Sequence, residues 1–71
     1  MIVKRRILVG QDGTSYEATA FGYEGKDVFC TVDDDCKERV VIATYSDGNR
    51  ACEVVNSILK NQDGPFTLPT S

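Results

Sequence analysis

The chain lacks histidine and tryptophan, and only two prolines and three cysteines occur among its 71 residues. Without histidine, general acid–base catalysis would depend on carboxylates, which fall in apparent turns or on the surface of a predicted helix. No two cysteines have CxxC spacing, so a zinc ion would need three thiolates plus a carboxylate or water as ligands. We therefore predict a non-enzymatic protein that uses no metal and no cofactor.

The three cysteines are predicted to lie in two kinds of surroundings. Cys30 falls in an apolar strand and Cys52 beside an apolar helix face, so both are expected to be small buried hydrophobic residues in a reducing compartment. Cys36 falls in the acidic turn of residues 33–38 and is expected to be exposed. Neighbouring carboxylates raise the pKa of such a thiol and make it a poor nucleophile.

Long apolar runs and a broad basic surface are also missing. No apolar run approaches the roughly 20 residues of a membrane span, and Lys4, Arg5 and Arg6 stand where a signal peptide would be apolar. These features predict a cytoplasmic protein that does not act at a membrane. The net charge is −3 and the isoelectric point is near 4.7, whereas nucleic-acid-binding domains usually carry a broad basic surface. DNA and RNA are therefore not expected as partners.

The strongest positive signal is a strand followed directly by an amphipathic helix. Residues 39–45 have the apolar and β-branched content of a strand, and Ser46 is expected to be the helix N-cap. The predicted helix covers about 47–61, and its apolar residues recur at helical spacing on one face: Ala51, Val54, Val55, Ile58 and Leu59. Lys60 complements the C-terminal end of the helix dipole, and the glycine and proline within residues 61–65 end the helix.

The rest of the chain reads as strands joined by short turns. Strands are predicted at about 1–9, 15–22 and 27–33, and residues 62–71 form a short extended tail. Because short turns make successive strands antiparallel, we predict a single α+β domain over residues 1–71. It consists of a four-stranded antiparallel β-meander, one C-terminal amphipathic helix across one face, and the tail. Phe66 and Leu68 share a face of that tail, so it is expected to fold back on the sheet edge, on the helix or on a neighbouring subunit.

The small size of the chain predicts self-association. A chain of 71 residues buries only about 60% of the surface that its unfolded form exposes. One helix cannot cover both faces of a sheet whose first and fourth strands carry apolar residues at both parities. We therefore predict a homo-oligomer.

The segment Ile42 to Ile58, IATYSDGNRACEVVNSI, resembles a recurring pattern in small uncharacterised proteins of Gram-positive bacteria and their phages. In that pattern a strand ends in an aromatic residue, a serine or threonine caps the helix, and Arg-Ala-x-Glu-Val-Leu continues it before a short proline-containing tail. The resemblance implies a binding role, which in some small phage proteins is the sequestration of nucleotide immune signals.

Two functional hypotheses follow. In the first, a small phosphate-bearing ligand of the nucleotide type binds at the positive helix N-terminus. The residues expected at that site are Tyr45 as a stacking partner for a base, Ser46, Asn49 and Arg50 at the helix start, and Lys4 or Arg6 from a neighbouring strand or subunit. Asp47 opposes this site, since its carboxylate competes for the same N–H groups. In the alternative hypothesis, the chain binds a host protein or another copy of itself through an uncovered sheet face or edge.

Overall fold

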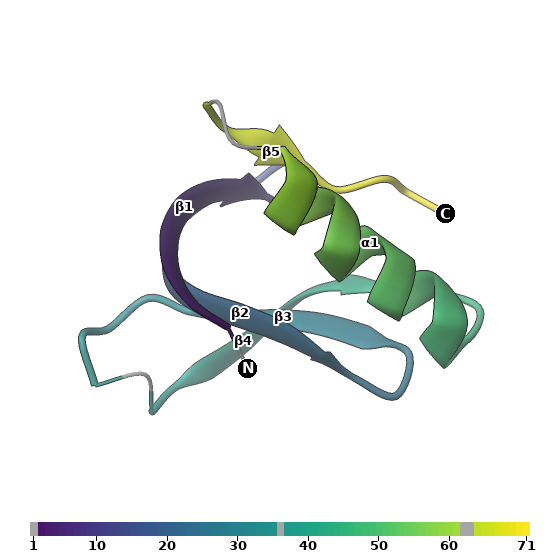
Figure 1. Ribbon diagram of the computed structural model, residues 1–71, viewed down its shortest axis with the longest axis horizontal. Coiled ribbons are helices and arrows are strands. Elements are labelled where there is room, and N and C mark those ends of the chain that lie inside the picture. Colours follow the sequence, from purple (N-terminus) through teal and green to yellow (C-terminus); the bar gives the residue numbers. More distant parts are fainter. Residues whose placement is uncertain (1, 36, 62–63) are drawn as a thin grey trace.

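One α-helix packs on a curled five-stranded sheet in the computed structural model of the protein, which describes residues 2–35, 37–61 and 64–71 (Figure 1). The predicted α+β class is therefore confirmed. The elements follow one another along the chain as β1 (Ile2–Val9), β2 (Ser15–Glu24), β3 (Asp27–Thr31), β4 (Arg39–Thr44), α1 (Gly48–Lys60) and β5 (Phe66–Thr67).

The first four strands form the predicted antiparallel meander. Each of them pairs with its neighbour in sequence, and the strand order across the sheet is β4-β3-β2-β1-β5. β2 continues two residues beyond its predicted end at residue 22, because its ladder with β3 extends to the pair of Glu24 and Asp27. Gly25 then turns the chain with a φ of 59°, in the left-handed region that glycine adopts without steric cost.

The tail adds a fifth strand that the sequence did not predict. β5 runs parallel to β1, with Leu8 opposite Phe66 and Val9 opposite Thr67, so the sheet is mixed and not purely antiparallel. The backbone N–H of Leu68 donates to the carbonyl oxygen of Val9 at 2.9 Å, and the Leu68 side chain is buried. Pro69, which has no N–H to donate, follows directly, so the pairing stops there.

The N-cap of the helix lies one residue after the predicted one, and the helix itself begins at Gly48. Asp47, not Ser46, is the N-cap, because its backbone is extended and its Oδ1 accepts from the N–H of Arg50 at 2.8 Å. Ala51, Val54, Val55 and Ile58 are buried, as the helical spacing predicted. The helix has 13 residues, and no helix in the described part of the chain is long and apolar enough to cross a membrane.

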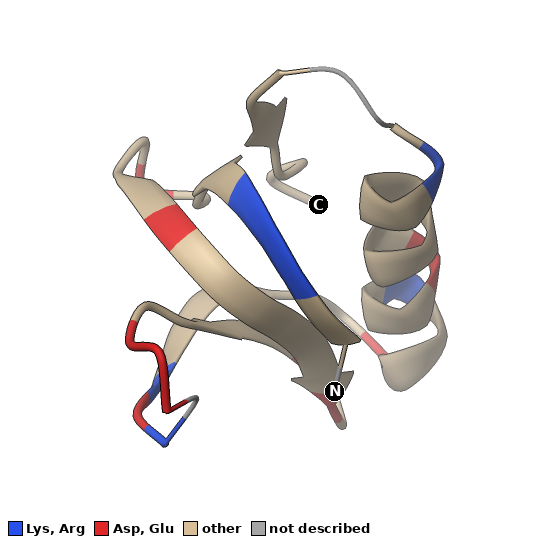
Figure 2. Ribbon diagram, turned by 60° about the vertical axis from the view of Figure 1, so that its left-hand side comes forward, with Lys and Arg blue, Asp and Glu red and all other residues tan. Residues whose placement is uncertain are grey.

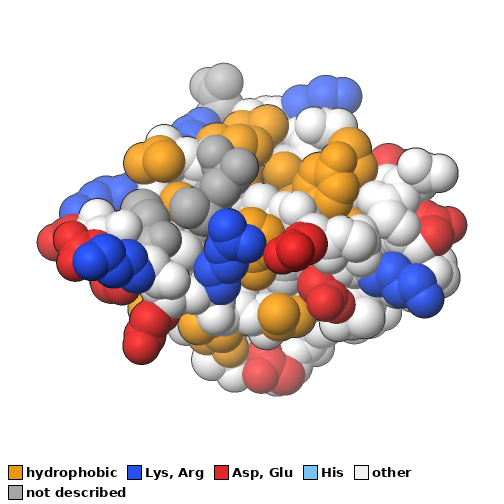
Figure 3. Space-filling model, turned by 90° about the horizontal axis from the view of Figure 1, so that it is seen from below, with side chains coloured by type: hydrophobic (Ala, Val, Ile, Leu, Met, Phe, Trp, Pro, Cys, Tyr) orange, Lys and Arg blue, Asp and Glu red, His pale blue; other side chains and the backbone are white. Residues whose placement is uncertain are grey.

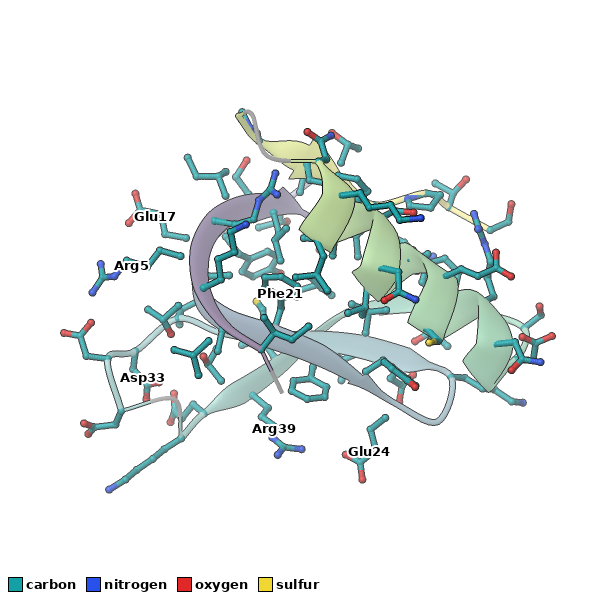
Figure 4. All side chains as sticks on the ribbon, in the orientation of Figure 1. Arg5, Glu17, Phe21, Glu24, Asp33 and Arg39 are labelled. Carbon is teal, nitrogen blue, oxygen red and sulfur yellow. The ribbon has the colours of Figure 1, made fainter. Side chains whose placement is uncertain are left out.

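The core lies between α1 and one face of the sheet. Phe21 is fully buried at its centre, where it is paired with Cys30 across the β2–β3 ladder (Figure 4). Leu8, Val54, Ile58 and Leu68 are also almost completely buried. The pairing of β1 with β2 is irregular between Val3 and Arg6, where β1 has one more residue than its partner. Such a bulge bends a strand, and β1 is strongly curved in Figure 1.

The turn after β1 reaches the outer edge of β4 and closes part of it. The Gln11 N–H donates to the Ile42 carbonyl at 3.0 Å. The Gln11 side-chain amide accepts from the Thr44 N–H at 2.9 Å and donates to the Thr44 carbonyl at 3.1 Å, as a neighbouring strand would. A Cβ on Gly10 would lie 2.9 Å from the Ile42 carbonyl oxygen, so this close approach requires glycine.

Candidate functional site

The residues predicted to bind a phosphate-bearing ligand lie in two separate places. Tyr45, Ser46, Asn49 and Arg50 are together at the start of α1, as their positions in the sequence require. Arg6 reaches the other end of the helix, where its Nη1 donates to the Ile58 carbonyl at 2.6 Å. Ile58 follows Arg50 by eight residues, which is roughly 12 Å along a helix. A single chain therefore does not bring Arg6 to the helix N-terminus.

The guanidinium of Arg6 is held by contacts within the protein itself. It is only 9% exposed, and its Nη2 donates to the Gly64 carbonyl at 3.1 Å, besides the bond to Ile58. The free carbonyls at the end of a helix carry partial negative charge, so a guanidinium is a favourable partner for them. Arg6 thus ties the basic stretch of β1, blue in Figure 2, to the last turn of α1 and to the chain that follows it.

The start of α1 is already supplied with a negative charge. The Asp47 carboxylate accepts from a first-turn N–H, and a phosphate at the helix N-terminus would compete with it for these donors. Arg50 donates through Nε and Nη2 to the carbonyl oxygen of Ser71 at 3.3 and 3.0 Å, and its Nη1 is 3.3 Å from Glu53. The predicted cation is therefore engaged with the protein itself.

The C-terminal tail lies against the predicted ligand-binding side chains. The carbonyl oxygen of Pro69 accepts from the Tyr45 hydroxyl at 2.8 Å and from Gln11 Nε2 at 3.2 Å. The Arg50 guanidinium lies 5.8 Å from the centre of the Tyr45 ring. Burial raises the pKa of the Tyr45 phenol, while the charge of Arg50 opposes this shift, so Tyr45 stays a proton donor. Sequence reasoning missed Gln11, because nothing local marks a glutamine in a turn as the partner of distant carbonyls.

The side chains suited to nucleophilic or metal chemistry are not assembled into a site. Cys30 is fully buried, as predicted, and burial raises the pKa of its thiol. Cys52 is partly exposed, and its thiol raises the pKa of the neighbouring Tyr23 phenol. The prediction for Cys36 falls outside the described residues. Within residues 2–35, 37–61 and 64–71, no group of three or more potential ligands is placed to hold a metal ion.

The sheet face opposite Phe21 and Cys30 is buried at its middle, where Ala20, Phe29 and Thr31 are at most 5% exposed. We call this surface the outer face; the strand registers place on it, in two adjacent rows, Val3, Ala20, Thr31 and Arg39, then Gly22, Phe29 and Val41. Arg39 and Glu24 lie on this side of the molecule in Figure 4. Seen from below in Figure 3, the surface shows apolar patches separated by basic and acidic side chains.

Exposed apolar side chains concentrate on and beside the outer face. Val3 is 76% exposed and Val41 is 56% exposed, although both are aliphatic. Ile7 and Val32, also substantially exposed, line a neighbouring hollow of about 460 Å³ between β1, β2, the loop after β3 and the segment after α1 at Gly64 and Pro65. Of the five exposed large apolar residues in the described chain, only Tyr23 belongs to the helix side of the sheet.

Charged side chains accompany these apolar ones in pairs of opposite sign. Arg39 is 3.3 Å from Glu24, and its guanidinium covers the Phe29 ring at 4.5 Å from the ring centre. Arg5 is 2.8 Å from Asp34 in the loop after β3. Lys4, which the sequence placed in the ligand site, lies instead beside a second hollow, of about 370 Å³, with Val3, Arg5, Thr19 and Asp34. The outer face therefore carries charged side chains and two exposed valines, Val3 on β1 and Val41 on β4, on either side of a buried middle.

No family model matches the chain, and the searches of curated proteins and of solved structures return no match either. The function is therefore inferred from the chemistry of the protein's own surface.

Proposed function

We propose that the protein is a non-catalytic interaction module that binds another protein surface through the outer face. The observation that carries this proposal is the gathering of Val3, Ile7, Val32 and Val41 on or beside one side of the sheet. Scattered exposed apolar residues need no explanation, but a cluster rimmed by charges is typical of a binding surface.

The composition of the outer face supports the same conclusion. Protein interfaces are enriched in aromatic residues and arginine, with an apolar centre and a polar rim. Arg39 is accessible and lies over the ring of Phe29, which is only 5% exposed, and Glu24 and Asp34 supply acidic groups near by. A partner that covered this surface would remove Val3 and Val41 from water, which is the main favourable term in most protein association.

Site-specific photo-crosslinking in the cells that make the protein tests the proposal. A photoreactive residue at Val41 is expected to give discrete adducts, while the same residue at Asn56, on the exposed side of α1, gives few or none. An adduct with a second copy and an adduct with another protein both support the module. Equal labelling from both positions, or none from Val41, would show that the outer face is not the binding surface.

A small phosphate-bearing ligand at the start of α1 is the second candidate. It is favoured by the position of the Arg50 cation beside the helix N-terminus, but the Tyr45 ring under Arg50 is only 5% exposed and offers little surface to a base. Such a ligand would have to displace Ser71 from Arg50 and overcome the charge of Asp47. Calorimetry with a panel of cyclic and linear nucleotides tests it. Binding that Arg50→Ala weakens would support this site, and the absence of heat from every nucleotide would exclude it.

A further inference from the structure

We infer that the hollow lined by Ile7 and Val32 binds a long basic side chain, lysine or arginine, of the partner protein. This inference rests on the proposed function, because the hollow adjoins the outer face, and it names the chemistry of the group that is bound there. The apolar stem of that side chain lies on the walls of the hollow, and its positive end pairs with Glu17.

The hollow has the volume and the apolar walls that a long side chain needs. Its volume of about 460 Å³ falls within the range of roughly 300–1,000 Å³ that is usual for ligand sites. Ile7 is 43% exposed and Val32 is 46% exposed, and Ala18 and Pro65 also line the hollow. A side chain placed here covers apolar surface that otherwise faces water, which favours binding.

Glu17 supplies an acidic group that has no partner in the protein. In the described part of the chain, its carboxylate makes neither a hydrogen bond nor an ion pair. Glu17 is exposed on β2 and is paired with Ile7 in the β1–β2 register, so the carboxylate stands beside an apolar wall of the hollow. In Figure 4 the Glu17 side chain extends outward from the sheet, away from α1. A cation that enters the hollow therefore meets an accessible acceptor.

The donors that line the hollow already have partners, which disfavours an anion. Arg5 donates to the Asp34 carboxylate at 2.8 Å, so its charge is balanced within the protein. Arg6 donates to two backbone carbonyls, and the Thr19 hydroxyl donates to the Asp33 carbonyl at 2.7 Å. An anion would have to compete with these acceptors. A cation at Glu17 displaces none of them.

Apolar walls beside one free carboxylate match the two parts of a lysine or arginine side chain. Both side chains have an apolar stem and a charged end that remains near water. A purely apolar side chain would leave Glu17 unpaired, and a compact cation such as ammonium would leave Ile7 and Val32 uncovered. The net charge of −3 on the whole chain adds a long-range attraction for a basic partner.

Nuclear magnetic resonance with a short peptide tests the site. The isotope-labelled protein is titrated with acetyl-Val-Ala-Lys-Ala-Val-amide in the millimolar range, and the amides of Ile7, Glu17 and Val32 are expected to shift most. The same peptide with norleucine in place of lysine keeps the apolar stem and lacks the charge. It should bind about three- to fivefold more weakly, as expected for an ion pair that stays accessible to water. High salt should remove most of this difference, because it screens the charges.

A matched pair of protein variants identifies the acceptor. Glu17→Gln keeps the size of the side chain and removes its charge, so it should weaken the lysine peptide by the same factor and leave the norleucine peptide unchanged. Glu24→Gln is the control, because Glu24 is exposed at the other end of β2 and is paired with Arg39. It should change the affinity for neither peptide.

Three results would overturn the inference. These are equal binding of the two peptides, undiminished binding of the lysine peptide to the Glu17→Gln variant, and an absence of shifts at the hollow. In each case, photo-adducts from Val41 with another protein would still support the proposed function, so the two can fail separately.

Discussion

The two cysteines in the described chain show how burial sets the chemistry of single side chains. Cys30 is fully buried, and burial raises the pKa of its thiol, whereas Cys52 is partly exposed. Alkylation requires the thiolate and access to it. We expect iodoacetamide to label Cys52 in the folded protein and Cys30 only after unfolding, as peptide mapping by mass spectrometry would show. Labelling of Cys30 at the rate of Cys52 would mean that the core opens at this point.

Arg6 is predicted to contribute to stability through its two hydrogen bonds to backbone carbonyls. Arg6→Met leaves the Ile58 and Gly64 carbonyls without their donor. A lost hydrogen bond to a charged group costs about 1.5–3 kcal/mol. The free energy of unfolding, measured with urea, should fall by about that amount. Arg5→Met is the matched control, because Arg5 is exposed, and it should change the free energy by no more than about 0.5 kcal/mol. Equal effects of the two substitutions would contradict this role of Arg6.

The local sequence shows that residues 4–6 are positively charged, but it does not predict which groups they contact. Lys4 and Arg6 were both predicted as candidate ligand contacts, yet Arg6 is buried, the intervening Arg5 is exposed and Lys4 borders a hollow. Strand alternation separates neighbours onto opposite faces, and the partner of Arg6 is 52 residues away in the chain. A single sequence carries no signal for such a contact.

At the scale of elements, two adjacent residues at the start of α1, Ser46 and Asp47, can be compared as N-caps. Asp47→Ala removes the carboxylate that accepts from the Arg50 N–H and should lower the free energy of unfolding by about 1 kcal/mol. Ser46→Ala leaves that bond in place and should have a small effect. Urea denaturation of both variants makes the comparison. If Ser46→Ala lowered the free energy of unfolding more than Asp47→Ala does, Ser46 would be the N-cap, as the sequence predicted.

The outer edge of β4 provides a second test at this scale. Gln11→Ala removes the acceptor of the Thr44 N–H, while the Gln11 backbone bond to Ile42 can remain. We expect hydrogen exchange at the Thr44 amide to become at least several-fold faster, with the amides of β2 and β3 unchanged. Asp12→Ala, in the same turn, is the control. Unchanged exchange at Thr44 would mean that Gln11 does not protect this edge.

The spacing of apolar residues in the sequence predicted those helices and strands that are long enough to show a period. The helix and the four meander strands each carry several apolar residues at the spacing of their type, so their positions were nearly correct. β5 has two residues, which is too short for any period, and its pairing is decided by its contact with β1. Likewise, the sequence brought Tyr45 and Arg50 together but gave no sign that Pro69 and Ser71 lie on them.

At the scale of the molecule, the outer face exists because the fold has only two layers, one helix and one sheet. One helix covers one side of the sheet, and apolar residues at both parities of the first and fourth strands must leave some of them on the other side. Val3 and Val41 are those residues. The sequence thus predicted that some apolar residues of these two strands lie on the side of the sheet away from the helix. The charge pairs that border this face depend on the strand registers and on the loop after β3, which the sequence did not provide.

The tail offers the last test, because it is weakly paired as a strand yet joined to the core. Leu68 is only 2% exposed, so Leu68→Ala leaves a cavity that costs about 2–5 kcal/mol. A domain of this size has a stability of about 4–10 kcal/mol at 0.05–0.15 kcal/mol per residue. The variant should therefore be largely destabilised. Thr67→Ala, at an exposed position of the same tail, should have little effect.

Circular dichroism of the helix and fluorescence of the tyrosines should lose signal at the same urea concentration, since Leu68, Tyr45 and α1 share one core. A tyrosine transition that precedes the helix transition would show instead that the tail unfolds separately from the domain.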